Sequence, residues 1–155
     1  MTPEIELVFR MITALSFPFA IFLYLRQRRK EADDHGRYLY ESLSSKYDDF
    51  LTLSLSNSDL RLWTREALFD ASEEQEERIF LLFQLLISLF ERAYVLTYSD
   101  HMTQAQARRW SSWDRYMEDW SKREDFRHRL TVLLAGYDPD FAAYILNVVE
   151  RTKAS

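Results

Sequence analysis

The stretch IFLLFQLLISLF, residues 79–90, decides the fold because it is apolar on nearly every face of a helix. It is 12 residues long, and charged residues flank it on both sides: Glu77 and Arg78 before it, Glu91 and Arg92 after it. A membrane-spanning helix needs about 20 apolar residues, whereas a core helix can be apolar all round at a shorter length. We therefore expect a fully buried helix over residues 73–99 at the centre of a globular core.

The composition of the chain predicts an all-α protein. Its 155 residues include only two glycines and three prolines, which leaves little material for hairpin turns or phosphate-binding loops. Leucine, alanine, glutamate and arginine, all good helix formers, recur throughout. The chain has no cysteine, which excludes disulfides, thiolate metal sites and a cysteine nucleophile.

Local start and stop signals divide the chain after residue 30 into helices. Two capping boxes and a cap followed by proline mark three helix starts: Ser72 with Gln75, Thr103 with Gln106, and Asp138 with Pro139. Gly136 marks a stop, and Asp59 suggests the cap of a short helix over residues 60–68. The predicted helices that cover 73–99 are residues 37–55, 103–121 and the C-terminal segments, ending with 141–152. Together they form a small antiparallel bundle.

The N-terminal stretch FPFAIFLYLRQRRK, residues 17–30, predicts a membrane anchor. Residues 11–25 carry no formal charge but span only about 22 Å as a helix, and extension back to Ile5 gives about 32 Å, enough for the hydrocarbon core. The side chains that we assign to the anchor are Phe17, Pro18, Phe19, Ile21, Phe22 and Tyr24. An alternative is an amphipathic helix that packs on the domain or lies flat on the membrane.

Basic residues follow the apolar run and predict its orientation. The cluster consists of Arg26, Arg28, Arg29 and Lys30, which we assign to anionic lipid headgroups. The positive-inside rule then places the N-terminus outside and the C-terminal domain in the cytoplasm, as a single-pass protein. The expected organisation is an anchor with a basic juxtamembrane cluster over 1–30 and a cytoplasmic helical bundle domain over 31–155. Residues 31–36, EADDHG, are either a stalk or a continued helix.

The charge balance argues against nucleic acid as a partner. The formal net charge is −5, and residues 26–155 carry −4 of it. Proteins that bind nucleic acid use basic patches that release counterions from the phosphates. The one dense basic patch of this chain stands beside an apolar run and suits lipid better.

The sequence predicts no catalytic, cofactor or metal site. The glutamates at 73, 74, 76 and 77 are explained by the start of a helix, where the dipole favours anions. Asp125 and His128 resemble half of a di-iron helix motif, but matching ligand-bearing helices are not apparent. There is no nucleophile elbow and no glycine-rich loop of standard spacing.

A stripe of aromatic residues on the predicted helix over 103–121 has two interpretations. Aromatic side chains at helical spacing are typical of a core. Tryptophan, tyrosine and arginine also dominate protein interfaces. The residues that we consider for a partner interface are Arg109, Trp110, Trp113, Tyr116 and Trp120.

Three stretches carry a resemblance to a group of proteins: NSDLRLWTREAL (57–68), WSSWDRYMEDWSKREDFR (110–127) and GYDPDFAAYI (136–145). In these stretches the chain resembles uncharacterised bacterial membrane-anchored helical proteins, which have an N-terminal membrane helix and a cytoplasmic helical domain. The resemblance implies location in the bacterial inner membrane. It supplies no catalytic residue that could be transferred to this chain.

The sequence favours a non-catalytic interaction or accessory subunit that holds a helical domain at the inner membrane, within a larger membrane protein complex. Its expected partners are membrane lipids and other membrane proteins or a second copy of itself. The alternative is a membrane-tethered enzyme or small-ligand sensor with a pocket inside the bundle, near Asp125, His128 and the tryptophans. That alternative requires a sizeable cavity with converging polar groups.

Overall fold

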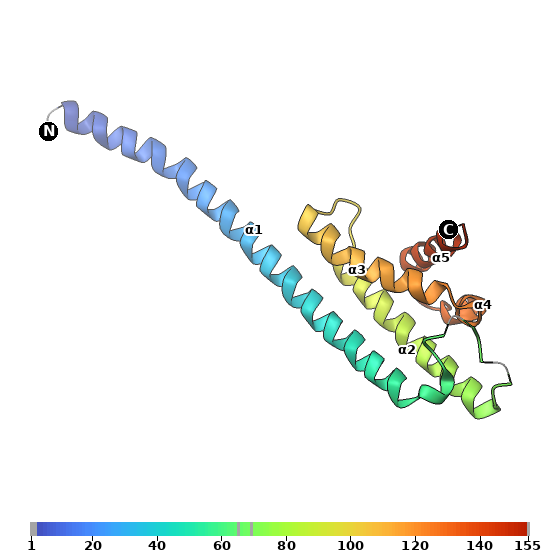
Figure 1. Ribbon diagram of the computed structural model, residues 1–155. Coiled ribbons are helices and arrows are strands. Elements are labelled where there is room, and N and C mark those ends of the chain that lie inside the picture. The colour runs from blue at the N-terminus through green and yellow to red at the C-terminus, as the bar shows by residue number, and fades with distance from the viewer. Residues whose placement is uncertain (1–2, 65, 69, 155) are drawn as a thin grey trace. The chain divides into compact units, whose positions relative to one another are not determined.

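The computed structural model describes the backbone of residues 3–64, 66–68 and 70–154, and the side chains of residues 21–28, 30–31, 33–64, 66–68 and 70–154. Every regular element in these residues is helical, which confirms the all-α prediction (Figure 1). The elements are α1 (Pro3–Ser56), the short 3-10 helix η1 (Ser58–Leu60), α2 (Glu73–Thr97), α3 (Gln104–Ser121), α4 (Glu124–Leu133) and α5 (Pro139–Lys153). The chain divides into two compact units, Met1–Tyr38 and Leu39–Ser155, and the boundary falls within α1.

Helix α2 begins as the sequence predicts. The hydroxyl of Ser72 accepts a hydrogen bond from the Gln75 backbone N–H at 3.2 Å, and the Gln75 side chain accepts one from the Ser72 N–H at 3.0 Å. This capping box satisfies two amides that the helix itself leaves without partners. Acidic residues occupy the first turn, where their negative charges are attracted to the positive end of the helix dipole.

Helix α2 is the central helix of the second unit. It contacts α3, α4 and α5, and its buried side chains are Ile79, Leu82, Phe83, Leu86, Ile87, Leu89, Phe90 and Ala93. Among the described residues it is also the one helix long and apolar enough to cross a membrane by length and composition. A core helix meets the same criteria, and the burial of these side chains agrees with the predicted core position.

The remaining helices follow their local signals. The hydroxyl of Thr103 caps α3 through the Gln106 N–H, and the carboxylate of Asp138 caps α5 through the Phe141 N–H at 2.9 Å. Pro139 occupies the start of α5. Gly136 lies between α4 and α5 with a φ of +88°, a backbone conformation that glycine adopts without steric cost.

The predicted short helix over residues 60–68 is wrong. The 3-10 helix η1 ends at Leu60, and residues 61–64 and 66–68 form no helix. Arg61 has a left-handed φ of 49°, and Leu60 and Leu62 are buried in the core. The carboxylate of Asp59 pairs with Arg78 at 2.5 Å, and η1 has no side-chain cap. Tertiary contacts therefore override the weak helical pattern of this segment.

In the first unit, the helical backbone of α1 continues through residues 31–36, so the EADDHG stretch is helical. Most of the predicted anchor, residues 5–20, lies outside the residues whose side chains are described. The side chains of the predicted anchor are therefore described only in its last residues, 21–25, and the described residues give no candidate membrane span in this stretch.

Candidate functional site: an aromatic pocket

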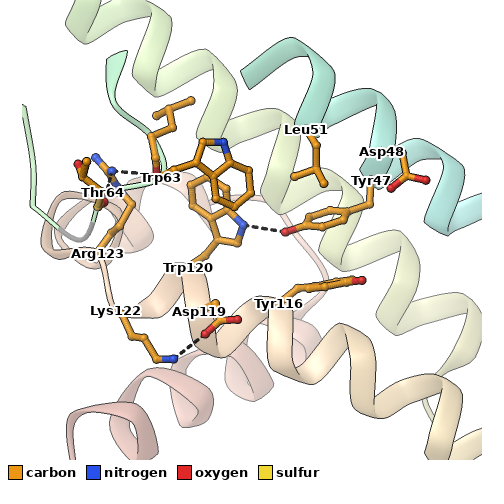
Figure 2. Close-up of a pocket in the computed structure, with 11 residues that line it drawn as sticks. Tyr47, Asp48, Leu51, Trp63, Thr64, Tyr116, Asp119, Trp120, Lys122 and Arg123 are labelled. Atoms are coloured by element: carbon orange, nitrogen blue, oxygen red, sulfur yellow. Dashed lines mark hydrogen bonds and ion pairs between the residues drawn. The ribbon is translucent and has the colours of Figure 1, made fainter. Parts of the chain in front are cut away.

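The second unit contains a pocket of about 390 Å³ that four aromatic side chains line (Figure 2). We call it the aromatic pocket, and its aromatic residues are Tyr47, Trp63, Tyr116 and Trp120. Its charged residues are Asp48, Asp119, Lys122 and Arg123, and Leu51, Leu62 and Thr64 complete it. The lining comes from α1, from the segment 62–64, and from α3 with the two residues that follow it. Its volume falls within the range of small-molecule sites, about 300–1,000 Å³.

Hydrogen bonding and ring stacking hold the aromatic walls in place. The Nε1 atom of Trp120 donates a hydrogen bond to the Tyr47 hydroxyl at 3.1 Å. Tyr116 stacks on Tyr47 with ring centroids 4.2 Å apart and an angle of 16° between the rings. The Trp63 ring lies 5.5 Å from that of Trp120 and, with 56% of the residue exposed, forms the outer part of the wall.

Burial also keeps the Tyr47 hydroxyl protonated. Loss of solvent raises the pKa of Tyr47 to about 12, although the hydrogen bond from Trp120 acts in the opposite direction. The nearby Tyr116 and Asp119 raise this pKa further. A neutral hydroxyl that accepts from Trp120 is therefore the stable form across the physiological range.

Arg123 fixes the segment that carries Trp63. The Arg123 residue is only 3% exposed, and its Nη1 atom donates to the backbone carbonyls of Arg61, Leu62 and Thr64 at 2.9, 2.9 and 2.6 Å. Its Nε and Nη2 atoms donate to Asp125 at 3.0 and 2.7 Å. Each of the three guanidinium nitrogens is thus occupied, and these bonds hold the non-helical conformation of residues 61–64.

The charges around the pocket are unevenly compensated. The Lys122 ammonium pairs with Asp119 at 2.5 Å, and the Arg123 guanidinium pairs with Asp125 behind the pocket. Four charged side chains line the pocket among the described residues, and of these Asp48 alone forms no ion pair. The pocket with its paired residues therefore carries a net negative charge.

The structure places the three tryptophans of the predicted interface in the core. Trp110, Trp113 and Trp120 are buried, so their side chains are not presented on the surface of the chain, and this part of the interface prediction is corrected. Apolar area at helical spacing is most stable when it is removed from water. Tyr116 and Arg109 are partly exposed, and for these two residues a partner interface stays a prediction.

Asp125 and His128 do not form a site together. The Asp125 side chain is 9% exposed and bound by Arg123, whereas His128 is 75% exposed and lies 3.9 Å from Glu124. Within the described part of the chain, no group of three or more potential ligands from His, Asp or Glu is placed to hold a metal ion. Of the tryptophans in the predicted stripe, Trp120 lines the aromatic pocket, but neither Asp125 nor His128 does.

A second hollow, of about 530 Å³, lies at Tyr94, Tyr98, Tyr144 and Arg151. The Tyr144 hydroxyl accepts from Trp110 Nε1 at 2.9 Å and donates to Asp114 at 2.6 Å. Burial and the Asp114 hydrogen bond raise the pKa of Tyr144. The Tyr144 hydroxyl is therefore engaged by two groups that do not line this hollow, and Tyr98 donates to Asp100 at 3.3 Å within it.

The predicted anchor and headgroup residues are accessible where they are described. Ile21, Phe22 and Tyr24 are exposed, and so are the basic residues Arg26, Arg28 and Lys30. The side chains of Phe17, Pro18, Phe19 and Arg29 lie outside the described residues.

The sequence did not reveal the aromatic pocket. Its four aromatic residues stand at positions 47, 63, 116 and 120, and only the last two share a helical stripe. The one local signal of a binding surface was Trp63, a large aromatic residue in a segment rich in polar residues. No protein-family model, curated protein or solved structure matches the chain.

Proposed function

We propose that this protein is a membrane-anchored, non-catalytic accessory subunit that holds its helical domain at the bacterial inner membrane. One observation carries the proposal. Five consecutive large apolar residues, Ile21 to Leu25, are each 46–58% exposed, and exposed basic residues follow them in the same helix. Contiguous exposed apolar surface is costly in water and marks contact with a membrane or a partner.

The order of residues in this part of α1 suits a membrane boundary. The Arg28 guanidinium lies 5.5 Å from the centre of the Tyr24 ring, one turn earlier in the helix. Tyrosine and arginine favour the interface between hydrocarbon and headgroups. Because the basic side follows the apolar side, we propose that the N-terminus is outside and the bundle is in the cytoplasm.

The proposed partners are lipids together with other membrane proteins or a second copy of the chain. A membrane anchor raises the effective concentration of the bundle near such partners. Tyr116 and Arg109 belong to residue types common in interfaces, and both are partly exposed.

The anchor is tested by fractionation of bacterial cells that produce the full chain. We expect the protein in the membrane pellet after alkaline carbonate washing, and the double variant F22K/L23K in the wash. The matched control is V132K, which places lysine at an exposed apolar position of α4, and it should stay in the pellet. Release of the unmodified protein by carbonate would contradict the anchor.

The accessory role is tested separately, by purification of the full chain from membranes solubilised in dodecyl maltoside. We expect a partner protein or a second copy to be recovered in stoichiometric amount. Recovery as a monomer without a partner would contradict this role while leaving the anchor intact.

A second candidate function, a tethered ligand-binding domain, is favoured by the aromatic pocket. It combines a cavity of small-molecule size with fixed aromatic walls and a carboxylate at Asp48. The two functions are compatible, because the pocket and the apolar run lie in different units of the chain.

A further inference from the structure

We infer that the aromatic pocket binds a small organic cation with an alkylated ammonium group. The inference rests on the second candidate function and does not depend on the membrane anchor. Three properties of the pocket carry it: its aromatic surfaces, its carboxylate without an ion pair, and the pairing of its two cationic side chains with other carboxylates.

The aromatic surfaces adjoin one another. Figure 2 shows Trp63 beside Trp120, and the hydrogen bond from Trp120 to Tyr47 joins these rings to Tyr47 and Tyr116. The electron-rich faces of such rings attract cations, and tryptophan does so most strongly. An alkylated ammonium group also buries its methyl groups against the rings, so the hydrophobic and electrostatic contributions act together.

The charge around the pocket selects a cation. Arg123 is neutralised by Asp125, and Lys122 by Asp119. Asp48 has no such partner among the described lining residues. A bound cation would supply the missing positive charge next to Asp48, and the nearby low-dielectric walls would strengthen that attraction.

The two cationic side chains of the pocket are already paired with carboxylates, which disfavours an anionic ligand. Arg123 donates through all three of its nitrogens to Asp125 and to three carbonyls. The Trp120 indole donates to Tyr47, and Lys122 donates to Asp119. A phosphate or carboxylate would have to compete with Asp119 and Asp125 for the two positive charges of the pocket.

The same arrangement argues against a small hydrated cation. Such an ion requires several converging oxygen ligands to replace its water shell. Among the described lining residues, two carboxylates are present, and one of them is bound by Lys122. An alkylated ammonium group sheds its weakly held water at lower cost and needs no oxygen shell.

The pocket is formed before any ligand arrives. The bonds from Arg123 to the 61–64 carbonyls fix the backbone on both sides of Trp63. Tyr47 is held by Trp120 and by stacking on Tyr116. A preorganised site loses less conformational entropy on binding than a flexible one.

The test is calorimetric titration of the full chain in dodecyl maltoside, a detergent that has no ammonium group. The probes are choline and tetramethylammonium, and the comparison compound is 3,3-dimethylbutan-1-ol, which has the shape of choline without its charge. We expect both cations to bind at one site and the neutral alcohol to bind at least tenfold more weakly. Ammonium ion should bind more weakly than tetramethylammonium.

Two variants connect the binding to the pocket. Asp48→Asn removes the uncompensated charge and should weaken choline binding about tenfold. Trp63→Ala removes an exposed ring that the bundle does not need for its core, and should weaken binding by a similar factor. The matched control is Asp49→Asn, because Asp49 is adjacent in sequence, is paired with Lys46 and does not line the aromatic pocket. It should leave choline binding unchanged.

The outcomes distinguish the cation inference from the ligand-binding function on which it rests. Equal affinity for choline and the neutral alcohol would overturn the cation inference and leave a ligand-binding domain. Binding of neither would overturn both. Equal loss in Asp48→Asn and Asp49→Asn would show that the cation responds to surface charge and would overturn the assignment to this pocket.

Discussion

The indole Nε1 of Trp120 donates a hydrogen bond to the hydroxyl oxygen of Tyr47, across 73 positions of the sequence and between two buried side chains. This bond joins α1 to α3 and forms one wall of the aromatic pocket. A buried N–H without an acceptor is costly. The pair therefore contributes to stability and to the shape of the pocket.

Replacement of Tyr47 by phenylalanine should destabilise the bundle. The variant Y47F keeps the ring but leaves Trp120 Nε1 without its acceptor, and we expect a loss of about 1–3 kcal/mol in the free energy of unfolding. Urea denaturation followed by tryptophan fluorescence measures this loss. The control is Y38F, since Tyr38 is largely exposed and should change stability by less than about 0.5 kcal/mol.

Alkaline pH should destabilise the same region. The pKa of Tyr47 is raised by burial from 10.0 to about 12, so the folded protein retains a proton that the unfolded chain loses. The stabilising contribution is complete below pH 10 and is lost as the pH rises from 10 toward 12. Y47F should therefore lose less stability than the unmodified protein over this range. An identical pH dependence in both would contradict this account.

Arg123 and Asp125 should behave as a coupled pair. The variant R123M leaves a buried carboxylate without its partner, and we expect it to cost about 3–5 kcal/mol. The double variant R123M/D125N should cost less than the sum of the two single variants. Thermal and urea unfolding of all three measure the coupling. The control K122M removes a partly exposed pair and should cost less than about 1 kcal/mol.

The two capping boxes should contribute similar amounts of stability. S72A and T103A each remove a hydroxyl that accepts a backbone N–H at a helix start, and each should cost about 1 kcal/mol. Ser111 offers a control, because its hydroxyl donates to a carbonyl within α3 and caps no helix start. S111A should change the urea midpoint by much less than either cap variant.

Gly136 should tolerate asparagine better than alanine. Its φ of +88° is unfavourable for a residue with a Cβ, although no atom lies within 4 Å of the Cβ position. We expect G136A to cost about 1–2 kcal/mol and G136N to cost less, because asparagine enters the left-handed region more readily. Equal losses in the two variants would contradict the assignment of the cost to the left-handed backbone conformation.

The helix starts and the central helix were predictable from sequence because their causes are local. Ser72 and Gln75 are three residues apart, as are Thr103 and Gln106, and each pair closes its hydrogen bonds without help from the rest of the chain. The apolar run at 79–90 predicts burial in the same direct way, since no face of that helix is polar. The structure confirms the helix starts, and it buries most of the run, but Leu81 and Leu85 are 55% and 47% exposed, so the helix is not fully buried.

The segment after η1 was predicted wrongly because its conformation is set from a distance. Arg123 donates to the carbonyls of Arg61 and Thr64, about 60 positions earlier in the sequence, and these bonds replace those that a helix would have formed. No pattern within residues 60–68 announces a partner so far along the chain. The predicted cap residue, Asp59, likewise binds Arg78 of α2 instead.

Sequence alone determined the helical class, the three helix starts and the apolar run over 79–90, because short-range hydrogen bonding and hydrophobic periodicity are written in neighbouring residues. Only the tertiary structure decided that three tryptophans of one stripe face inward and that Trp63 joins Tyr47, Tyr116 and Trp120 around a pocket. Those relationships depend on which distant surfaces pack against each other, and the hydrophobic effect that drives the packing has no direction of its own.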